Sequence, residues 1–259
     1  MGDGITILAL AGAAALASPV GGLIALWKKP TTLFMSLALG FASGVLLATI
    51  CFSMLPQALE LGRLWIAIGG FTAGFLAVLG FDLFIHRWKV AGKQAEQRPQ
   101  VERFYQRRRP RGSAVTVLAG GTSAEELIEG LSIGVGAAIK PGLGLLIAVA
   151  IFVDNLAESL SIAEIIRAER ERRNPVKRIL GWTGLIGLSV LGSALAGWFL
   201  LRGLSQPLLG FLFGSGAGGM FYLVVTDLLP EAEERQYQQS AALSLCGGFL
   251  LMFVLSQFL

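Results

Sequence analysis

Apolar runs of roughly 20 residues follow one another along almost the whole chain, and short joins separate them. A run of this length can cross the hydrocarbon core of a bilayer as an α-helix, which satisfies its own backbone polar groups. Proline marks several of the joins, at Pro30, Pro141, Pro175 and Pro207. The pattern predicts an all-α polytopic membrane protein with eight transmembrane helices. The expected spans are about 4–27, 32–57, 64–86, 114–139, 142–166, 178–201, 205–230 and 238–259.

The composition supports this interpretation. Of the 259 residues 54% are hydrophobic and only 15% are charged, whereas soluble domains carry about 25% charged residues. The apolar runs leave no room for a separate soluble domain, so we expect a single transmembrane domain over residues 1–259. The longest join, 87–113, is expected to be a basic cytoplasmic loop within it, with contact to anionic lipid as an alternative role.

The basic residues predict how the chain crosses the membrane. Eighteen of the 21 Lys and Arg residues fall in alternate joins, and the other joins hold only Arg63, Lys140 and Arg202. Because cytoplasmic loops are rich in Lys and Arg, we expect both termini outside the plasma (inner) membrane and the basic loops in the cytoplasm. The net charge of +4 therefore reflects membrane orientation, and we expect no nucleic-acid partner.

Two segments carry the same polar pattern 29 residues apart. Residues 125–133 read EELIEGLSI, and residues 154–162 read DNLAESLSI. Adjacent spans cross in opposite directions, so this match predicts an inverted pair. A second, weaker match joins 40–60 with 214–234, which share Gly, Leu-Pro, Ala and Glu in register. Two halves related in this way are common in secondary transporters, where the substrate binds at the repeat interface.

The acids of the first repeat are expected to form a site. Positions four apart share a helix face, which pairs Glu125 with Glu129 and Asp154 with Glu158. Positions three apart are also neighbours, so a second, adjoining set pairs Glu126 with Glu129 and Asn155 with Glu158. Ionised carboxylates inside a bilayer are costly unless they share protons, line water or bind a cation. The alternative is that they lie at span ends in water, or pair with each other in the protonated form.

Oxygen ligands without His or Cys favour Mn²⁺, Mg²⁺ or Ca²⁺, although Zn²⁺ and Fe²⁺ can still compete.

Glu164 lies nearer a basic join, where an interfacial salt bridge is the favoured interpretation. Asp227 precedes Pro230 and is either part of an acidic exit for a cation or an ordinary solvated helix end. With Glu231, Glu233 and Glu234, Asp227 would form an acidic mouth, and the counterparts at the outer end of the second span, Gln57 and Glu60, are candidates for the entrance. Cys51 and Cys246 are expected to be buried small apolar residues rather than a disulfide or metal pair.

At these residues the chain resembles the ZIP family of divalent metal transporters. The segments GVLLATICFSMLPQALEL and GGMFYLVVTDLLPEAEER resemble the second and seventh spans of that family. Its fourth-span motif, His-Asn-x-Pro-Glu-Gly, corresponds here to EELIEG at 125–130, and the fifth-span motif corresponds to DNLAES at 154–159. The motif His and both motif prolines are replaced, by Glu125, Ile128 and Ala157, so we expect straighter helices there.

The resemblance implies a binuclear metal site halfway through the transport path. One metal position would use Glu125, Glu129, Asp154 and Glu158. The other would use Glu126, Asn155, Glu129 and Glu158, so that Glu129 and Glu158 bridge the two.

The sequence predicts a transporter of divalent cations such as Mn, Fe, Zn or Cd, working by alternating access. The cation is substrate, and no prosthetic group is expected. The alternative is a ZIP-like membrane protein that is inactive in transport and instead senses cations or protons. Because the chain shows no nucleophile–base motif or phosphate-binding loop, we do not expect an enzyme. The expected partners are the cation, the lipid bilayer and, as an open prospect, a second copy in a homodimer.

Overall fold

The computed structural model describes residues 2–85, 114–168, 174–201, 203–234 and 238–258, of which the side chains of 2, 3, 85, 114–124, 168 and 234 are not described. The described residues are almost entirely helical, and none of them forms a strand. The predicted basic loop at 87–113 lies outside the described residues. The α-helices are α1 (Gly2–Trp27), α2 (Thr32–Thr49), α3 (Leu55–Leu61), α4 (Leu64–Ile85), α5 (Ala114–Ile139), α6 (Pro141–Ala168), α7 (Pro175–Ala196), α8 (Gln206–Leu223), α9 (Leu229–Glu234) and α10 (Gln238–Phe258). Three five-residue π-helical segments, η1 (Ile50–Met54), η3 (Gly197–Leu201) and η4 (Val224–Leu228), join or extend them.

Seven segments of the described chain are long and apolar enough to cross a membrane. They are Gly4–Trp27, Thr32–Leu61, Leu64–Phe84, Pro141–Arg167, Pro175–Leu201, Gln206–Glu233 and Gln238–Phe258. The all-α polytopic fold is thus confirmed. The remaining predicted span, 114–139, is the fourth in chain order and is present as α5, a helix of 26 residues, but it is not among these seven. The number eight therefore stays a prediction.

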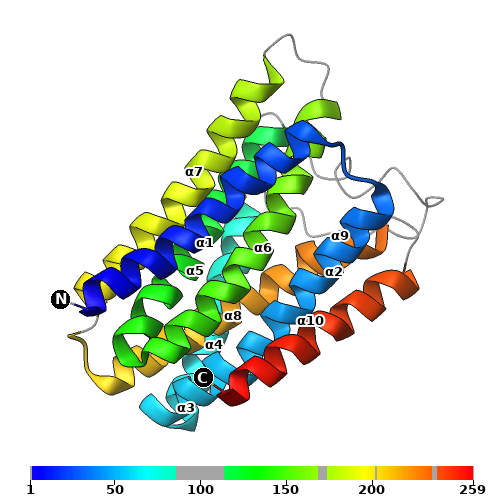
Figure 1. Cartoon of the computed structure of the whole chain (residues 1–259). Coiled ribbons are helices and arrows are strands. Elements are labelled where there is room, and N and C mark those ends of the chain that lie inside the picture. The colour runs from blue at the N-terminus through cyan, green and yellow to red at the C-terminus, as the bar shows by residue number, and fades with distance from the viewer. Residues whose placement is uncertain (1, 86–113, 169–173, 202, 235–237, 259) are drawn as a thin grey trace.

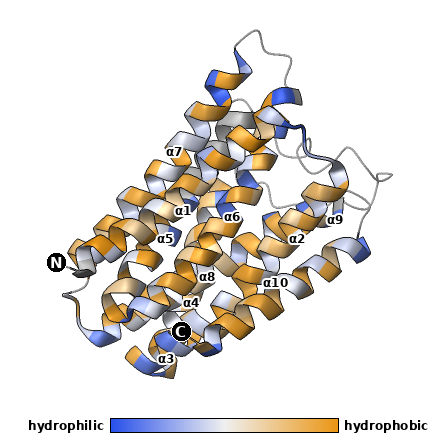
Figure 2. Ribbon diagram, in the orientation of Figure 1, coloured by the Kyte–Doolittle hydropathy of each residue, from blue (hydrophilic) through white to orange (hydrophobic). Residues whose placement is uncertain are grey.

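The helices form an elongated bundle with two groups (Figure 1). In one group α1 packs on α6 and α7, and α5 packs on α7 and α6. In the other group α10 packs on α2, and α4 packs on α8. The groups meet where α2 lies against α6 and α5 against α8. Both termini lie at one end of the bundle, and α9 lies at the other (Figure 1). Hydrophobic residues dominate the helices in Figure 2, as a lipid-embedded bundle requires.

Local signals explain where several helices begin and end. The Thr31 hydroxyl accepts a hydrogen bond from the Phe34 N–H at 3.2 Å and caps α2. The Asn174 side chain accepts one from the Val176 N–H at 3.0 Å and caps α7, which starts at Pro175. The Arg167 guanidinium donates to the Leu26 carbonyl at 2.9 Å, which satisfies a carbonyl at the open end of α1.

The second sequence repeat has a structural counterpart in the π-helical segments. The Leu55 N–H bonds to the Ile50 carbonyl, and the Leu229 N–H bonds to the Val224 carbonyl, in each case five residues back. Each bond directly precedes a proline, Pro56 or Pro230. A proline ring clashes with the carbonyl four residues earlier in an α-helix, and the wider π turn removes that clash without ending the helix.

Helix contacts also repeat in register. A Cβ added at Gly44 would lie 2.0 Å from the Leu245 carbonyl oxygen, and one added at Gly218 would lie 2.0 Å from that of Phe71. Position 218 follows position 44 by 174 residues, and position 245 follows position 71 by the same interval. The α2–α10 and α8–α4 pairs are therefore packed alike through glycine, as close helix approach in a membrane requires. In Figure 1, α2 and α8 run in opposite directions.

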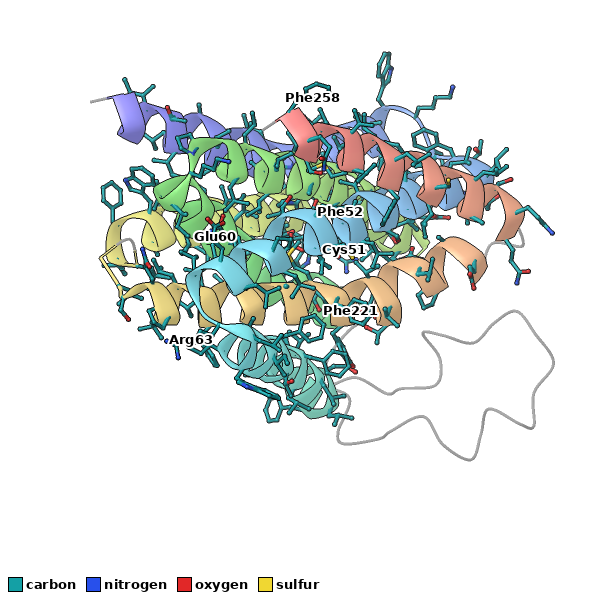
Figure 3. All side chains as sticks on the ribbon, turned by 90° about the horizontal axis from the view of Figure 1, so that it is seen from below. Cys51, Phe52, Glu60, Arg63, Phe221 and Phe258 are labelled. Atoms are coloured by element: carbon teal, nitrogen blue, oxygen red, sulfur yellow. The ribbon has the colours of Figure 1, made fainter. Side chains whose placement is uncertain are left out.

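The prediction that both cysteines are buried is wrong. Cys51 and Cys246 are free and exposed on the surface of the bundle. Figure 3 shows Cys51 beside Phe52, whose ring packs instead against Phe249 of α10 at a centroid distance of 5.5 Å. In a bilayer such an outward position contacts lipid tails, which accept a thiol as readily as a protein core does. An apolar run therefore does not by itself tell a core-facing position from a lipid-facing one.

Candidate metal site between α5 and α6

The six predicted site residues lie on α5 and α6, which pack against each other. Both helices are unbroken α-helix through the positions where the motif prolines are replaced, Ile128 and Ala157. Four of the six side chains are buried in the bundle, with exposed fractions of 1% for Glu126, 3% for Glu129, 3% for Asp154 and 0% for Asn155. Glu125 and Glu158 are half-buried. None of the six is fully exposed toward lipid or water.

A hydrogen bond between α5 and α6 joins matched positions of the repeat. The Asn155 side-chain N–H donates to Glu126 Oε2 at 3.3 Å. Positions 126 and 155 are the equivalent second residues of EELIEGLSI and DNLAESLSI. The pair thus brings the two segments together at the same register, as an inverted repeat predicts.

Two buried carboxylate oxygens have no hydrogen-bond partner, Glu129 Oε2 and Asp154 Oδ1. Buried polar atoms are nearly always paired, because leaving one unpaired costs about 1–3 kcal/mol and more if it is charged. An orphaned carboxylate oxygen inside a membrane bundle is therefore a place where a proton, water or cation is needed.

The charged neighbours of these acids, among the described residues, are other acids. Glu126 lies within electrostatic range of Glu129, Glu158 and Asp154. Glu125 and Glu158 are both also within range of Asp227. Like charges repel strongly in a low-dielectric interior. The array can therefore carry its full negative charge only when a cation or protons offset it.

Asp227 lies in η4 and is exposed. Its proximity to Glu125 and Glu158 links the central acids to the α9 end of the bundle, which favours its interpretation as part of an acidic path. A second acid near Glu125, Asp82 of α4, was missed by the sequence reasoning. The Tyr222 hydroxyl of α8 donates to Asp82 Oδ2 at 2.8 Å. The sequence does contain a signal for this residue, because Asp82 is the only acid in the third apolar run.

The acidic side chains do not converge on a common metal position. Among the described residues, no group of three or more His, Cys, Asp or Glu side chains is arranged to hold a metal ion. The predicted residues are thus gathered in one interior region but not converged. A cation would have to draw the side chains together by rotation about their own bonds.

Serines from the two flanking helices contact the matched pair. Ser18 of α1 donates to Asn155 Oδ1 at 2.8 Å. Ser193 of α7 lies 3.2 Å from the Glu126 carbonyl oxygen and 2.7 Å from the Ser189 carbonyl of its own helix. Sequence reasoning named neither serine, because a serine in an apolar span is usually bonded to its own helix.

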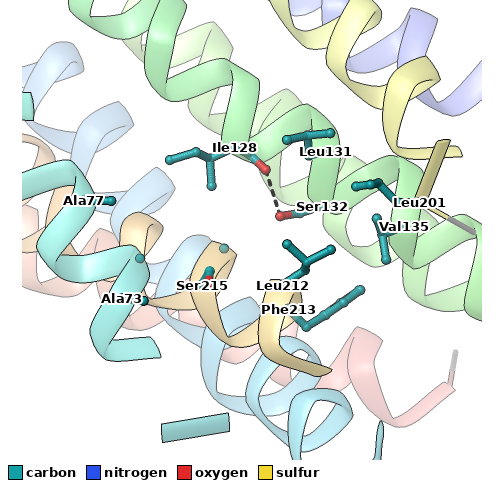
Figure 4. A pocket seen from close by; sticks show the side chains of 12 residues that line it. Ala73, Ala77, Ile128, Leu131, Ser132, Val135, Leu201, Leu212, Phe213 and Ser215 are labelled. Carbon is teal, nitrogen blue, oxygen red and sulfur yellow. Dashed lines mark hydrogen bonds between the residues drawn. The ribbon is translucent and has the colours of Figure 1, made fainter. Parts of the chain in front are cut away.

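A cavity of about 340 Å³ lies elsewhere, between α4, α5, α8 and η3. Its wall includes Ala73, Leu131, Val135 and Leu212, and the Ser132 hydroxyl that faces it already donates to the Ile128 carbonyl at 2.9 Å (Figure 4). A cation needs oxygen ligands, so this apolar cavity is not a candidate metal site.

Comparison with known proteins agrees with these features. A family model described as ZIP zinc transporter matches residues 92–256. The zinc transporter ZupT of Corynebacterium efficiens is 30% identical over 257 residues, which cover 93% of this chain and 92% of that protein. The ZupT protein of Corynebacterium glutamicum is 30% identical over 252 residues, covering 93% and 94%. That of Escherichia fergusonii is 29% identical over 249 residues, covering 94% and 91%. This chain, an integral membrane protein, therefore belongs to the ZIP zinc transporter family.

Proposed function

We propose that this protein transports divalent metal cations across the plasma membrane through the acids of α5 and α6. The observation that carries the proposal is the buried array of Glu126, Glu129 and Asp154, in which two carboxylate oxygens lack any partner. Membership of the ZIP family supports the same conclusion. Glu125, Asn155 and Glu158 complete the proposed ligand set, and a transported cation is the substrate rather than a resident cofactor.

Zinc is the first candidate cation, because the relatives are zinc transporters by name. The donors of this chain are all oxygens, which are the ligands that Mn²⁺ prefers, whereas Zn²⁺ commonly takes nitrogen or sulfur as well. We therefore propose that the site accepts Mn²⁺ and Fe²⁺ in addition to Zn²⁺ and Cd²⁺. A side-by-side measurement of Zn²⁺ and Mn²⁺ uptake tests this.

The proposed path runs from the end that holds the termini to the α9 end. By the positive-inside rule we expect the α9 end in the cytoplasm, where Asp227 and Glu231 would supply further carboxylates. The Ser161 hydroxyl donates to Glu231, which ties α9 to α6. Alternating access would move the α1–α5–α6–α7 group against the α2–α4–α8–α10 group, because the most extensive helix contacts lie within each group.

The experiment is uptake by the full chain in proteoliposomes loaded with a metal-sensitive dye. We expect Zn²⁺ or Mn²⁺ influx by the wild type and loss of influx in Glu129→Gln, which keeps the shape of the side chain but removes its charge. Glu164→Gln is the control, because Glu164 is a half-buried acid on the neighbouring helix α6 that does not belong to the proposed ligand set. Equal influx by the wild type and Glu129→Gln would refute the site.

A second candidate function is cation or proton sensing without transport. It is favoured by one observation, that no three ligand side chains converge within the described residues. Tight Zn²⁺ or Mn²⁺ binding in detergent together with no influx of Mn²⁺, Fe²⁺, Zn²⁺, Co²⁺ or Cd²⁺ would favour sensing over transport.

A further inference from the structure

Ser18 is fully buried in the middle of α1, directly before Pro19, and faces α6. Its hydroxyl lies 2.8 Å from Asn155 Oδ1, and the Asn155 amide in turn contacts Glu126 at 3.3 Å. Three side chains from three helices, α1, α6 and α5, thus form one short chain of hydrogen bonds inside the bundle.

The chemistry of the three groups orients this chain. The Asn155 atom that faces Glu126 is the NH₂ nitrogen, which suits an ionised carboxylate because that group can only accept hydrogen bonds. The carbonyl oxygen of the amide then faces Ser18, and an amide oxygen can only accept. The Ser18 hydroxyl is therefore the donor, and its bond stabilises the orientation of the amide that the Glu126 carboxylate selects.

This orientation affects how Asn155 can meet a cation. The only metal-binding atom of an asparagine side chain is its carbonyl oxygen, and in this conformation that oxygen faces Ser18 of α1 while the NH₂ group faces Glu126. A cation bound beside Glu126 can reach that oxygen only after the amide has turned, and turning the amide breaks both the Ser18 bond and the Glu126 bond. The hydrogen-bonded chain therefore competes with metal binding on the 126–155 side of the array.

We propose that Ser18 is a positioning residue that holds the Asn155 amide away from the metal and so weakens binding of hard cations at the α5–α6 site. The proposal rests on the proposed function, because it assigns a regulator of affinity to that same site. A transporter must release its cargo, and a bond that re-forms when the cation leaves favours release.

The other half of the molecule supplies a matched control. Ser193 lies against Glu126 as Ser18 lies against Asn155, but its hydroxyl approaches only backbone carbonyls. A Cβ added at Gly130 would lie 2.0 Å from Ser193 Oγ, so the absence of a side chain there lets Ser193 reach the α5 backbone. The matched position on α6 is Ser159, which has a side chain. Removing the Ser193 hydroxyl frees no ligand atom.

The test titrates the purified full chain in detergent with Mn²⁺ and, separately, with Zn²⁺. Ser18→Ala should bind Mn²⁺ about fivefold more tightly, because one neutral hydrogen bond no longer opposes binding. The gain should be smaller for Zn²⁺, which depends less on a carbonyl oxygen. Ser18→Thr, which keeps the hydroxyl, and Ser193→Ala should bind like the wild type. Unchanged Mn²⁺ affinity in Ser18→Ala, or an equal gain in Ser193→Ala, would overturn the proposal.

A double-mutant cycle separates positioning from a general effect on packing. In the Asn155→Ala background, Ser18→Ala should leave Mn²⁺ affinity unchanged, because no amide remains to be released. Thermal unfolding of the same four proteins without metal should show coupling between the two positions. Absence of coupling would overturn the role of Ser18 and leave the proposed transport function standing. If the wild type bound neither Mn²⁺ nor Zn²⁺ while the coupling was present, the proposed function would fail and the metal role of Ser18 with it.

Discussion

The two kinds of repeat in this molecule are preserved to different degrees. In the α2–α10 and α8–α4 pairs the same glycine-to-carbonyl approach recurs at the same interval of 174 residues. In the α5–α6 pair the polar positions recur at an interval of 29, but their chemistry differs, because Glu126 corresponds to Asn155 and Gly130 to Ser159. The flanking serines differ too, since Ser18 contacts a side chain and Ser193 only backbone.

The difference has a physical reason. Where two helix backbones touch, any added atom collides with the neighbouring helix, so both halves are held to glycine. A polar site has no such constraint on symmetry, because many arrangements of donors and acceptors satisfy the same groups. Acids also differ between the two ends of the bundle: η4 carries Asp227, whereas the matched position of η1 is Ser53, a buried hydroxyl without a partner. The central acids therefore connect to an acidic group toward the α9 end, and the matched position of η1 offers no acid.

The largest expected effect comes from filling the repeated glycine contacts. A Cβ at Gly74 would lie 1.9 Å from the Ser215 carbonyl oxygen, and one at Gly248 would lie 2.2 Å from that of Phe41. We expect Gly74→Ala and Gly248→Ala to destabilise the fold by similar amounts, about 3 kcal/mol, because helices must separate. Gly247→Ala is the control, since nothing lies within 4 Å of its added Cβ. Thermal unfolding in detergent measures all three variants. If Gly248→Ala kept its stability while Gly74→Ala lost it, the two helix pairs would not be packed equivalently.

Removing single charges from the acid array should have the next largest effect. Glu129→Gln and Glu158→Gln should each weaken binding of Mn²⁺ or Zn²⁺ by about tenfold or more, because an anionic ligand is lost. Glu164→Gln should change affinity little, since Glu164 is not among the acids that neighbour the array. Isothermal titration of the purified proteins gives the affinities. Similar losses in all three variants would mean that the array acts only through its overall charge.

Acidification should weaken metal binding. Carboxylates must be deprotonated to bind a cation, so protons compete with the metal and affinity falls as the pH falls. Each proton displaced contributes up to about a tenfold change per pH unit. Affinity measured at several pH values should therefore fall toward acid, and with a shallower slope in Glu158→Gln, which has one fewer titratable group. A pH-independent affinity would show that the acids are not the ligands.

The smallest expected effect concerns a contact that has no counterpart in the other half. Tyr222→Phe removes the hydrogen bond to Asp82. In the other half, the position matched to Tyr222 is Ala48 and the position matched to Asp82 is Ser256, so this bond has no equivalent there. We expect a loss of about 1 kcal/mol in the free energy of unfolding and no change in metal affinity. Thermal unfolding and metal titration of the same preparation check both. A marked loss of affinity would instead assign Asp82 to the metal path.

Much of the fold was predictable from residue patterns. The lengths of the apolar runs predict helices within a few residues, for example 32–57 against α2, η1 and the start of α3. Gly44 and Gly218, with the Leu-Pro pairs, predict the matched halves. The burial of Glu126, Glu129 and Asp154 agrees with the expectation that such acids face the interior of a bundle, where the cost of their charge can be offset. The site itself stays a prediction until a metal is measured there.

The sequence by itself determined what a bilayer demands of single helices: their length, their lack of charge on most faces, and the position of the acids along them. Only the tertiary structure decided which faces meet. It placed Cys51 and Cys246 outward, brought Asp82 and Asp227 near Glu125, and set Ser18 against Asn155. In lipid, inward and outward faces are almost equally apolar, so periodicity cannot tell them apart. The rotation and approach of each helix come instead from the close packing of small residues contributed by distant parts of the chain.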